Sequence, residues 1–502
     1  MKPLKEKGPL PAGMREREAY RKVTEALVRR RSGATVADIT AATALPLSQI
    51  RELLPMAADE FSGRLEVTES GEIRYSFPRG FVSRYRGFNA ALRRFSARLL
   101  TGLGKLAALA FKVWIMLMLI GYFVLFMAIA FASLFISVAV NSRDSSSSRS
   151  GGQYIGPGMF NLIWRLWFYS ELTRSLDRHY EAGRRPGREN KRPLHRAIFS
   201  FVFGEEDPNK NWAAVEKKAL IAYIQVHKGV ISQPEVMALT GKDSVGAEQV
   251  IMACCAEFGG SPEATADGVL VYRFDELLLR ADTRDRSFSG LSAPLQRLKR
   301  FSVNPKTMNV WFGLINTVNL FFGSYFLYNA FTAGVLATQE QFNAASYLYA
   351  VAYYLFSRVI TPAPHLLIGL GLGLVPLAFS LFFWLIPALR LLWEKKENEQ
   401  SKLRNLRRLG FSRIWEHPLE VESGDIKSDA PECRPRDLAA AQDRVIKEMA
   451  AWSVPDVEMN PRGTTVYSFK ELEREKQALE KYRSDISGEQ SSLGKTVFDS
   501  ES

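Results

Sequence analysis

The longest apolar run of the chain, LAALAFKVWIMLMLIGYFVLFMAIAFASLFISVAV at 106–140, constrains the fold more than any other feature. About 20 apolar residues in a helix suffice to cross the hydrocarbon core of a bilayer, and this run is much longer. Its one cation, Lys112, stands near the start, where a lysine side chain reaches the lipid headgroups. The sequence therefore predicts an integral membrane protein that crosses the bilayer more than once if other runs qualify.

Two further runs, 310–337 and 365–393, are also long and apolar enough to cross a bilayer. Two shorter aromatic stretches, 155–169 and 346–360, each contain an arginine, and we expect them to be interfacial or re-entrant. The linker at 332–343 has no lysine or arginine, whereas the outer flanks of the two long runs are basic. This charge distribution predicts an in-out-in hairpin for the two long runs.

The topology of the first run has two alternatives, because both of its flanks are basic. The run could bend at Gly121 and return, or the stretch 155–169 could complete a second crossing.

The positive charge of the chain, +13 in total, is concentrated beside the apolar runs. The basic stretches are 79–112, 178–196, 297–306 and 390–408. Cations in these places match cytoplasmic flanks and anionic headgroups, so the charge indicates a lipid bilayer as partner and argues against nucleic acid.

One short pattern occurs three times: Glu, four residues, Gly, three residues, Tyr, one residue, Phe. Its copies are EVTESGEIRYSF (66–77), EATADGVLVYRF (263–274) and EMNPRGTTVYSF (458–469). Alternating apolar residues on both sides of a Gly-containing turn predict a β-hairpin. Glycine there permits a positive φ, and Tyr and Phe two residues apart face the same side of the strand. We therefore expect each hairpin to pack on the helices of a small domain.

Helical patterns precede each hairpin. In the first copy they cover 16–31, 35–39 and 47–61, and in the second 215–229, 232–241 and 245–260. Short helices followed by a hairpin are the order of a winged helix. Before the third hairpin only 437–452 is a clear helix, so that module is predicted to be partial. The expected fold class is mainly α with small β-hairpins: helical transmembrane segments plus two or three winged-helix-like α+β modules.

The predicted organisation follows from these patterns. It comprises a disordered N-terminus (1–15), module 1 (16–85), a basic flank with transmembrane and interfacial segments (86–170), a basic linker (171–198), module 2 (199–283), a second basic linker (284–307), transmembrane helices with an interfacial or re-entrant segment (308–394), a partial module 3 (395–470), and a charged helix with a disordered tail (471–502).

Winged helices often bind DNA, but the third helices here lack the necessary charge. In module 1, Arg51 stands among Glu52, Asp59 and Glu60, and in module 2 the third helix has no lysine or arginine. DNA binders neutralise phosphates with several basic side chains, so these modules fit protein partners better.

The chain shows no signature of an enzyme or a cofactor site. A Walker loop, a nucleophile elbow and kinase motifs are missing from the sequence. The string GLGLGL at 369–374 lies inside an apolar run and indicates close helix packing. The cysteines Cys254, Cys255 and Cys433 lack zinc or disulfide spacing and fit a reducing compartment. Transport is a weaker alternative, since Asn316 and Asn319, on one helix face, are predicted to hydrogen-bond a neighbouring helix.

The most unusual stretch outside the apolar runs is FSFVFGEEDPNKNW at 199–212. Its alternation predicts a strand that ends in a turn before the next helix. Three adjacent carboxylates without spaced partners are weak evidence for a metal. We therefore expect a contact with a protein partner, and the candidate residues are Phe203, Gly204, Glu205, Glu206 and Asp207.

The motif FVFGEEDPN, the modules with their hairpins and the run NVWFGLINTVNLFFGSYFLYNA together resemble a family of uncharacterised integral membrane proteins of bacteria, with related sequences in chloroplasts. The resemblance covers 195–340 best. It implies an integral membrane protein and transfers no functional residue.

The resulting hypothesis is a non-enzymatic scaffold or adaptor in the bacterial inner membrane, with the modules on the cytoplasmic side. Its partners would be the bilayer and soluble proteins, or further copies of the chain. The alternatives are a transport or channel component regulated by the modules and, third, a membrane-bound DNA-binding regulator.

Overall fold

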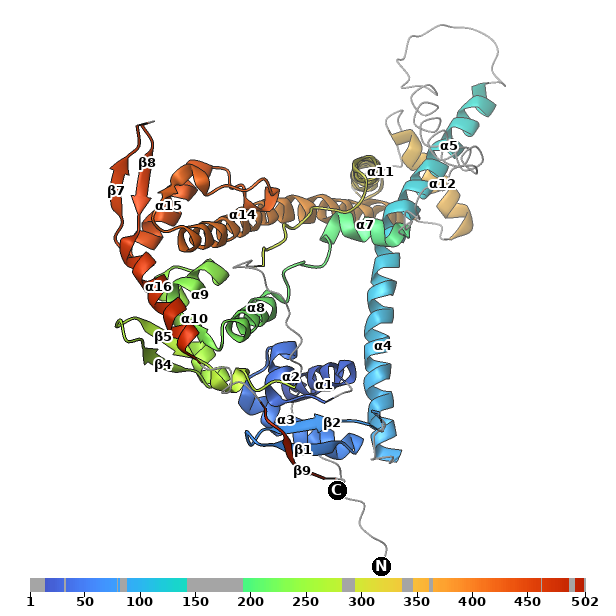
Figure 1. The fold of residues 1–502 in the computed structure, drawn as a ribbon. Coiled ribbons are helices and arrows are strands. Elements are labelled where there is room, and N and C mark those ends of the chain that lie inside the picture. Colours follow the sequence, from blue (N-terminus) through green and yellow to red (C-terminus); the bar gives the residue numbers. More distant parts are fainter. Residues whose placement is uncertain are drawn as a thin grey trace, which may run out of the picture. The chain divides into compact units, whose positions relative to one another are not determined.

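The computed structural model describes residues 14–30, 33–78, 80–81, 88–141, 193–281, 294–335, 346–360, 364–461, 463–486 and 493–500. In these residues helices predominate, and the strands form small antiparallel sheets (Figure 1), as predicted. The chain divides into two compact units. The membrane unit is Gly102–Glu205 with Phe301–Leu391, and the module unit is Met1–Thr101, Glu206–Arg300 and Leu392–Ser502. The predictions for 1–13, 155–169 and most of both basic linkers lie outside the described residues.

The membrane unit is built from helices, three of which contain π-helical segments. Its elements are the end of α4 (Phe88–Met116), η1 (Leu117–Gly121), α5 (Tyr122–Asn141), α7 (Leu194–Phe203), α11 (Lys306–Asn329), η3 (Ala330–Val335), α12 (Tyr347–Val359), α13 (His365–Ile368), η5 (Gly369–Leu374) and the start of α14 (Val375–Glu416). Three helices are long and apolar enough to cross a membrane: Gly102–Ile136, Lys306–Thr332 and His365–Glu416.

Of the two alternatives for the first apolar run, the one in which it bends at Gly121 and returns is wrong. Leu117–Gly121 is a π segment inside one continuous helix, so the run does not turn back there. A π segment adds a residue to a helical turn without reversing the chain. The short helix α12 packs Tyr349 and Ala352 into a cluster with Phe126 and Phe326.

Side chains of one helix satisfy backbone groups of another inside the membrane unit. Asn316 Nδ2 donates to the carbonyl of Ser380 at 3.0 Å, and Asn319 Nδ2 donates to that of Leu119 at 2.8 Å. Tyr122 Oη donates to the carbonyl of Gly371 at 2.9 Å. Leu119 and Gly371 lie in π segments, where the regular helical bonds are disturbed. The predicted role of both asparagines as donors to neighbouring helices is thus confirmed.

Helix α11 approaches η5 and α14 closely at Gly323. A Cβ placed on Gly323 would stand 2.9 Å from the backbone nitrogen of Leu377. Backbone atoms cannot move aside, so Gly323→Ala is expected to cost about 1–3 kcal/mol and to lower the melting temperature in detergent. Gly371→Ala is the matched control, because nothing lies within 4 Å of its added Cβ. Equal melting temperatures for the two variants would contradict this packing.

Each of three segments of the module unit contains helices followed by a β-hairpin. Module 1 has α1 (Met14–Arg29), α2 (Val36–Thr43), α3 (Leu47–Phe61), β1 (Arg64–Thr68) and β2 (Ile73–Ser76). Module 2 has α8 (Trp212–Val226), β3 (Val230–Ile231), α9 (Gln233–Thr240), α10 (Ser244–Phe258), β4 (Ser261–Ala264) and β5 (Leu270–Arg273), then the short turn η2 (Asp275–Leu277). Module 3 has the end of α14, β6 (Val421–Glu422), η6 (Ser423–Asp425), η7 (Pro431–Cys433), α15 (Leu438–Ala450), β7 (Asp456–Met459) and β8 (Thr465–Ser468).

The tyrosine of each repeated pattern occupies the same place in its sheet. Tyr75 pairs with Leu65 on one side and Ala34 on the other. Tyr272 likewise lies between Pro262 and Ile231. In module 3, Tyr467 lies between Val457 and Val421. In modules 2 and 3 the second strand of the hairpin is therefore the middle strand of its sheet, paired with a short strand that precedes it by many residues. In module 1 the middle strand is β1, between β2 and β9 (Thr496–Asp499), and β2 adds a single bridge to Ala34 on its other side.

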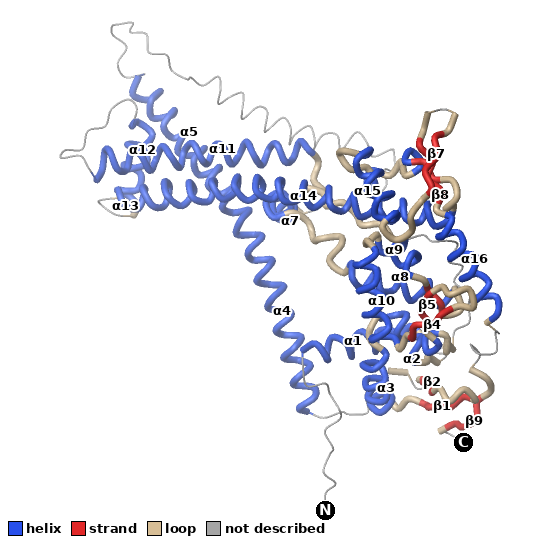
Figure 2. Tube along the Cα trace, turned by 90° about the vertical axis from the view of Figure 1, so that its left-hand side faces the viewer, coloured by secondary structure: helices blue, strands red, loops and turns tan. Residues whose placement is uncertain are grey.

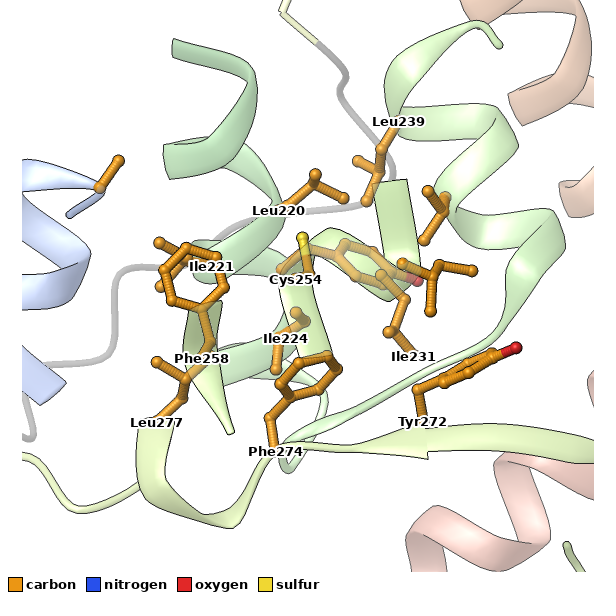
Figure 3. Packing of buried hydrophobic residues seen from close by; sticks show 14 of the residues in the cluster. Leu220, Ile221, Ile224, Ile231, Leu239, Cys254, Phe258, Tyr272, Phe274 and Leu277 are labelled. Carbon is orange, nitrogen blue, oxygen red and sulfur yellow. The ribbon is translucent and has the colours of Figure 1, made fainter. Parts of the chain in front are cut away.

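The glycine and phenylalanine of the pattern have the predicted structural roles. Gly71, Gly268 and Gly463 have φ values of 77°, 78° and 76°. This left-handed region costs glycine little, and a tight hairpin turn requires it. Phe77, Phe274 and Phe469 are buried at the end of their hairpins. In module 2, Phe274 points toward Ile224 among the core residues of the helices (Figure 3).

Two parts of the chain differ from expectation. Residues 199–203 belong to helix α7 in the membrane unit, not to a strand, because the cluster of Ala197, Ile198 and Phe201 has helical spacing. The C-terminal region is neither only solvated nor disordered where it is described. Helix α16 (Lys470–Asp485) buries Leu472 and Leu479, and β9 (Thr496–Asp499) pairs with β1 (Figure 2).

Candidate partner-binding site

The predicted contact residues Phe203 and Gly204 end helix α7 in the membrane unit. The ring of Phe203 is partly exposed and stacks on Phe199 with centroids 4.9 Å apart. Gly204 has a φ of 83°, and a Cβ there would stand 3.3 Å from the guanidinium of Arg390. Glycine at this position thus ends the helix and makes room for Arg390.

The three predicted acids do not form one cluster. Glu205, the last residue of its membrane-unit segment, accepts a hydrogen bond from Ser200 Oγ at 2.7 Å. Glu206, in the module unit, is exposed and pairs with Lys210 at 3.1 Å. Asp207 pairs with Lys299 at 3.0 Å. Each acid has a partner of its own, and the described residues contain no group of three His, Cys, Asp or Glu placed to hold a metal. A role in binding a protein partner stays a prediction.

Asp207 takes part in a small group of ion pairs in the module unit. Partial burial raises the pKa of its carboxyl, but the backbone N–H of Asn209 and the ammonium of Lys299 outweigh that effect and hold the pKa below its usual range. Lys299 Nζ also contacts Glu397 at 2.7 Å. One lysine thus joins the turn after Glu206 to helix α14.

Three asparagines hold the extended segment 294–300, which has no regular secondary structure. Each asparagine donates to the carbonyl and accepts from the N–H of a single residue, as a neighbouring strand would. Asn209 does so with Arg297 (2.7 and 3.0 Å), Asn398 with Lys299 (2.9 and 2.8 Å), and Asn405 with Gln296 (2.9 and 2.8 Å). Because buried peptide groups must be paired, these amides let an irregular segment lie against α14.

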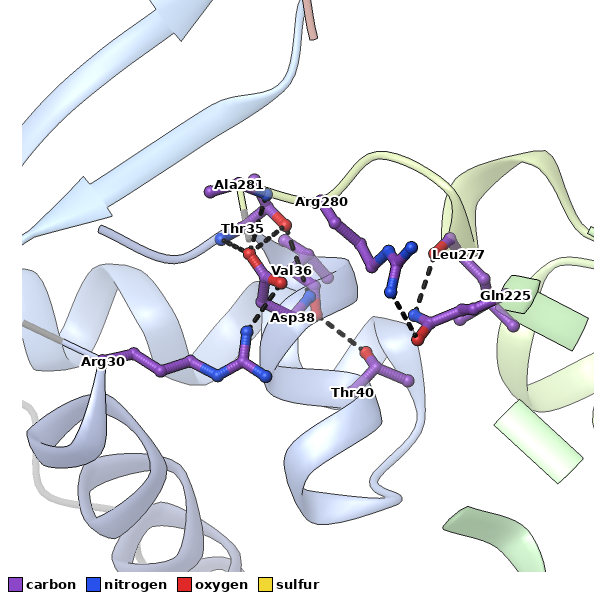
Figure 4. Close-up of polar contacts among 9 residues, drawn as sticks. All are labelled: Arg30, Thr35, Val36, Asp38, Thr40, Gln225, Leu277, Arg280 and Ala281. Carbon is purple, nitrogen blue, oxygen red and sulfur yellow. Dashed lines mark hydrogen bonds and ion pairs between the residues drawn. The ribbon is translucent and has the colours of Figure 1, made fainter. Parts of the chain in front are cut away.

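Modules 1 and 2 meet at a buried carboxylate, Asp38 (Figure 4). Its oxygens accept hydrogen bonds from Arg30 Nη1 at 2.7 Å, from the backbone N–H of Thr35 at 3.1 Å, and from that of Ala281 at 2.9 Å. The first two partners cap and anchor α2, whereas Ala281 follows the hairpin of module 2. A buried charge is tolerated only when hydrogen-bonded, so this contact links the two modules specifically.

A second buried carboxylate holds the C-terminal helix on module 2. Glu235 lies in α9 and is fully buried. Arg483 of α16 donates to its two oxygens at 2.9 and 2.8 Å, and Tyr223 Oη donates at 2.6 Å. Arg483 also donates to the carbonyl of Val230 at 2.8 Å. Helix α16 follows module 3 in the chain but is bonded to module 2.

Glu475, a half-buried carboxyl also in α16, is expected to make the stability of the module unit depend on pH. Burial raises the pKa of its carboxyl to about 7, and the charge of Glu235 adds to the rise, although a hydrogen bond from Trp452 lowers it. In the unfolded chain this carboxyl loses its proton near pH 4.5, whereas in the folded protein it keeps the proton up to about pH 7. The stability that Glu475 contributes is therefore fully present below pH 4.5 and is lost as the pH rises to about 7.

We expect Glu475→Gln to reduce the loss of melting temperature between acidic and mildly alkaline buffer, because an amide does not ionise. Thermal unfolding of the full chain in detergent at several pH values measures this. Glu471→Gln, on the exposed side of α16, is the control and should keep the wild-type profile. A wild-type profile for Glu475→Gln would contradict the assignment.

The outer face of α10 in module 2 is free of positive charge. Val245 and Met252 are 64% and 51% exposed. The remaining exposed residues of this face are Glu248, Gln249, Ala253 and Ala256. We call these six residues the α10 face.

In module 1, Arg51 of α3 pairs with Glu276 at 3.0 Å. Burial raises the pKa of the Cys254 thiol, on the inner side of α10, to about 12, which disfavours the reactive thiolate.

Sequence reasoning missed the asparagine contacts and both buried carboxylate junctions. Asn398 and Asn405 are seven residues apart, two turns on one face of a helix, and this spacing was a usable signal. The pairs Arg483–Glu235 and Asp38–Ala281 join residues far apart in the sequence, and no local pattern indicates them.

Comparison with known proteins agrees with the family resemblance in part. The chain is 23% identical over 398 residues to the uncharacterised chloroplastic protein At5g03900 of Arabidopsis thaliana, covering 76% of this chain and 70% of that protein. No protein-family model matches the chain, and no solved structure matches it. A distant chloroplastic relative fits an uncharacterised family with plant members, and three helices long enough to cross a membrane fit membrane association.

Proposed function

We propose that the chain is a non-enzymatic membrane protein whose winged-helix-like modules form a scaffold for a soluble protein partner. The order helix, short strand, two helices and hairpin in module 2, with the sheet order β3-β5-β4, supports the winged-helix comparison. The buried residues of all three modules form one continuous cluster. A continuous core favours a rigid platform over independent domains.

The α10 face carries the proposal. The third helix is the element that a winged helix inserts into DNA, and there it needs lysine and arginine to neutralise phosphates. The α10 face instead offers Val245 and Met252 beside Glu248. Exposed apolar residues with a methionine at helical spacing are typical of surfaces that bind proteins. We therefore propose that this face binds a protein and not a nucleic acid.

The experiment is purification of the tagged full chain from native membranes in mild detergent, followed by mass spectrometry. We expect a stoichiometric soluble partner that is lost from the double variant Val245→Glu/Met252→Glu. The control variant Val226→Glu/Leu270→Glu places the same charges on exposed residues of module 2 outside α10 and should retain the partner. If both variants retain the partner, the α10 face is not its binding surface. If the wild-type chain purifies without any partner, the scaffold proposal is wrong.

For location we propose a bacterial inner membrane with the modules on the cytoplasmic side. The basic stretches that flank the apolar helices support this orientation. Protease added to sealed vesicles of known orientation tests it, since cleavage within 206–300 should occur only where the cytoplasmic face is outside.

A transport or channel role is the second candidate, and one observation favours it. Asn316 Oδ1, Asn319 Oδ1 and Ser380 Oγ are buried in the membrane unit and have no hydrogen-bond partner among the described residues. Unpaired oxygens at such depth commonly coordinate water or a permeating ion. Reconstituted vesicles decide the matter: ion or solute flux that Ser380→Ala abolishes would favour transport, and flux equal to that of empty vesicles would exclude it.

A further inference from the structure

Among the residues that the structure describes, a groove between helices α14 and α15 of module 3 has no role assigned so far. Its volume is about 150 Å³. It is lined by Gln400, Leu403, Arg404, Arg407, Ala441 and Arg444. On α14 the positions 400, 404 and 407 follow one helical face, and on α15 the positions 441 and 444 do the same. Two helices thus contribute three arginines to the lining of one small volume.

The groove has more positive than negative charge. The carboxylate of Glu448 in α15, which is 15% exposed, pairs with two of the lining arginines. Arg407 contacts Glu448 through two nitrogens, and Arg444 Nε contacts it at 2.8 Å. The exposed side chain of Arg404 makes no hydrogen bond or ion pair within the part of the chain that the structure describes. Three cations therefore face one carboxylate.

Glu448 also orders the groove before any ligand arrives. A long arginine side chain loses rotamer freedom when it binds a ligand, and this loss weakens binding. Because Glu448 already holds Arg407 and Arg444, most of that ordering has occurred in the free protein. The apolar side chains of Leu403 and Ala441 add a partly dry wall, which strengthens electrostatic attraction inside the groove.

We propose that this groove binds a phosphate group. Guanidinium groups donate in pairs to the oxygens of a phosphate, and arginines on two helices surround such an anion better than they do a planar carboxylate. The amide of Gln400 supplies a further donor at the rim. The phosphate belongs either to a soluble molecule or to an anionic lipid headgroup, since both present the same chemistry.

The test uses the full chain in a phosphate-free maltoside detergent. Titration calorimetry with inorganic phosphate measures the soluble source. Native mass spectrometry after transfer from nanodiscs of phosphatidylcholine with phosphatidic acid counts retained lipid and measures the other source. The variant Arg404→Gln/Arg444→Gln leaves the pair Arg407–Glu448 in place. The control Arg413→Gln/Arg474→Gln removes the same charge from exposed positions outside the groove.

We expect the wild-type chain to bind one phosphate group saturably, by one of the two routes, and the groove variant to bind it at least about tenfold more weakly. The control should bind as the wild type does. Phosphate binding without lipid retention identifies a soluble ligand, and the reverse identifies a headgroup. Absence of saturable binding by either route, or equal weakening in the control, would overturn the proposal. If the double variant melts early, Arg404→Gln alone is compared instead, because Arg404 makes no bond that folding requires.

Discussion

Replacing Arg483 by alanine is expected to destabilise the module unit by about 3–5 kcal/mol. The substitution leaves Glu235, which is fully buried, without the two hydrogen bonds that Arg483 donates. An uncompensated charge in the interior is among the most costly defects that one substitution creates. The bond from Tyr223 remains, but it does not neutralise the carboxylate.

The measurement is urea unfolding of the full chain in detergent, together with hydrogen exchange of α16 and β9. We expect faster exchange in both elements, because the bonds from Arg483 to Glu235 fix α16 on module 2 and β9 follows α16 in the chain. Arg474→Ala is the matched control on the same helix, since its side chain is 79% exposed. Unchanged exchange in α16 of the Arg483 variant would show that the pair does not hold the helix.

Replacing Phe274 by alanine is expected to cost a similar amount, about 3–5 kcal/mol. The ring is fully buried at the end of the hairpin of module 2, in contact range of the close turn at Gly260, where an added Cβ would lie 2.4 Å from it. Removing the ring leaves a cavity that the surrounding helices cannot close, since their residues are packed around it (Figure 3).

Urea unfolding again measures the loss, and the control is Leu270→Ala in the same hairpin, whose side chain is about half exposed. We expect the control to lose only about 1 kcal/mol, because a half-exposed leucine buries about half of the area that a core leucine buries. Similar losses for both variants would mean that Phe274 does not close the core of module 2.

The local patterns that predicted correctly are those in which neighbouring residues carry the information. Helical spacing located α3 and α10 within a few residues, and glycine with alternating apolar residues located the three hairpins. The long apolar run at 106–140 predicted a membrane helix, but it did not distinguish a continuous helix with a π segment from a bent one. In the π segment the carbonyl of Leu119 accepts a hydrogen bond from Asn319 of another helix, a contact that no local pattern indicates.

The candidate site was predicted less well, because its contacts also depend on residues that are distant in the sequence. Phe203 to Asp207 are adjacent in the chain, so the sequence indicated one patch, yet each acid bonds to a different partner. Alternating aromatic residues before Gly204 also fit a strand, and only packing against other helices of the membrane unit selects α7. Periodicity over so few residues does not separate the two structures.

By itself, the sequence determined the membrane helices, the three hairpins and the positive φ of their glycines, because each follows from chain geometry and solvent exposure over fewer than about 20 residues. Only the tertiary structure decided that α16 and β9 bind modules 2 and 1, and that three asparagines hold the segment 294–300. These contacts join residues with up to several hundred residues between them. Each such contact forms where a buried polar group still lacks a hydrogen-bond partner. Which groups lack one depends on how the core packs, and the sequence alone does not give this packing.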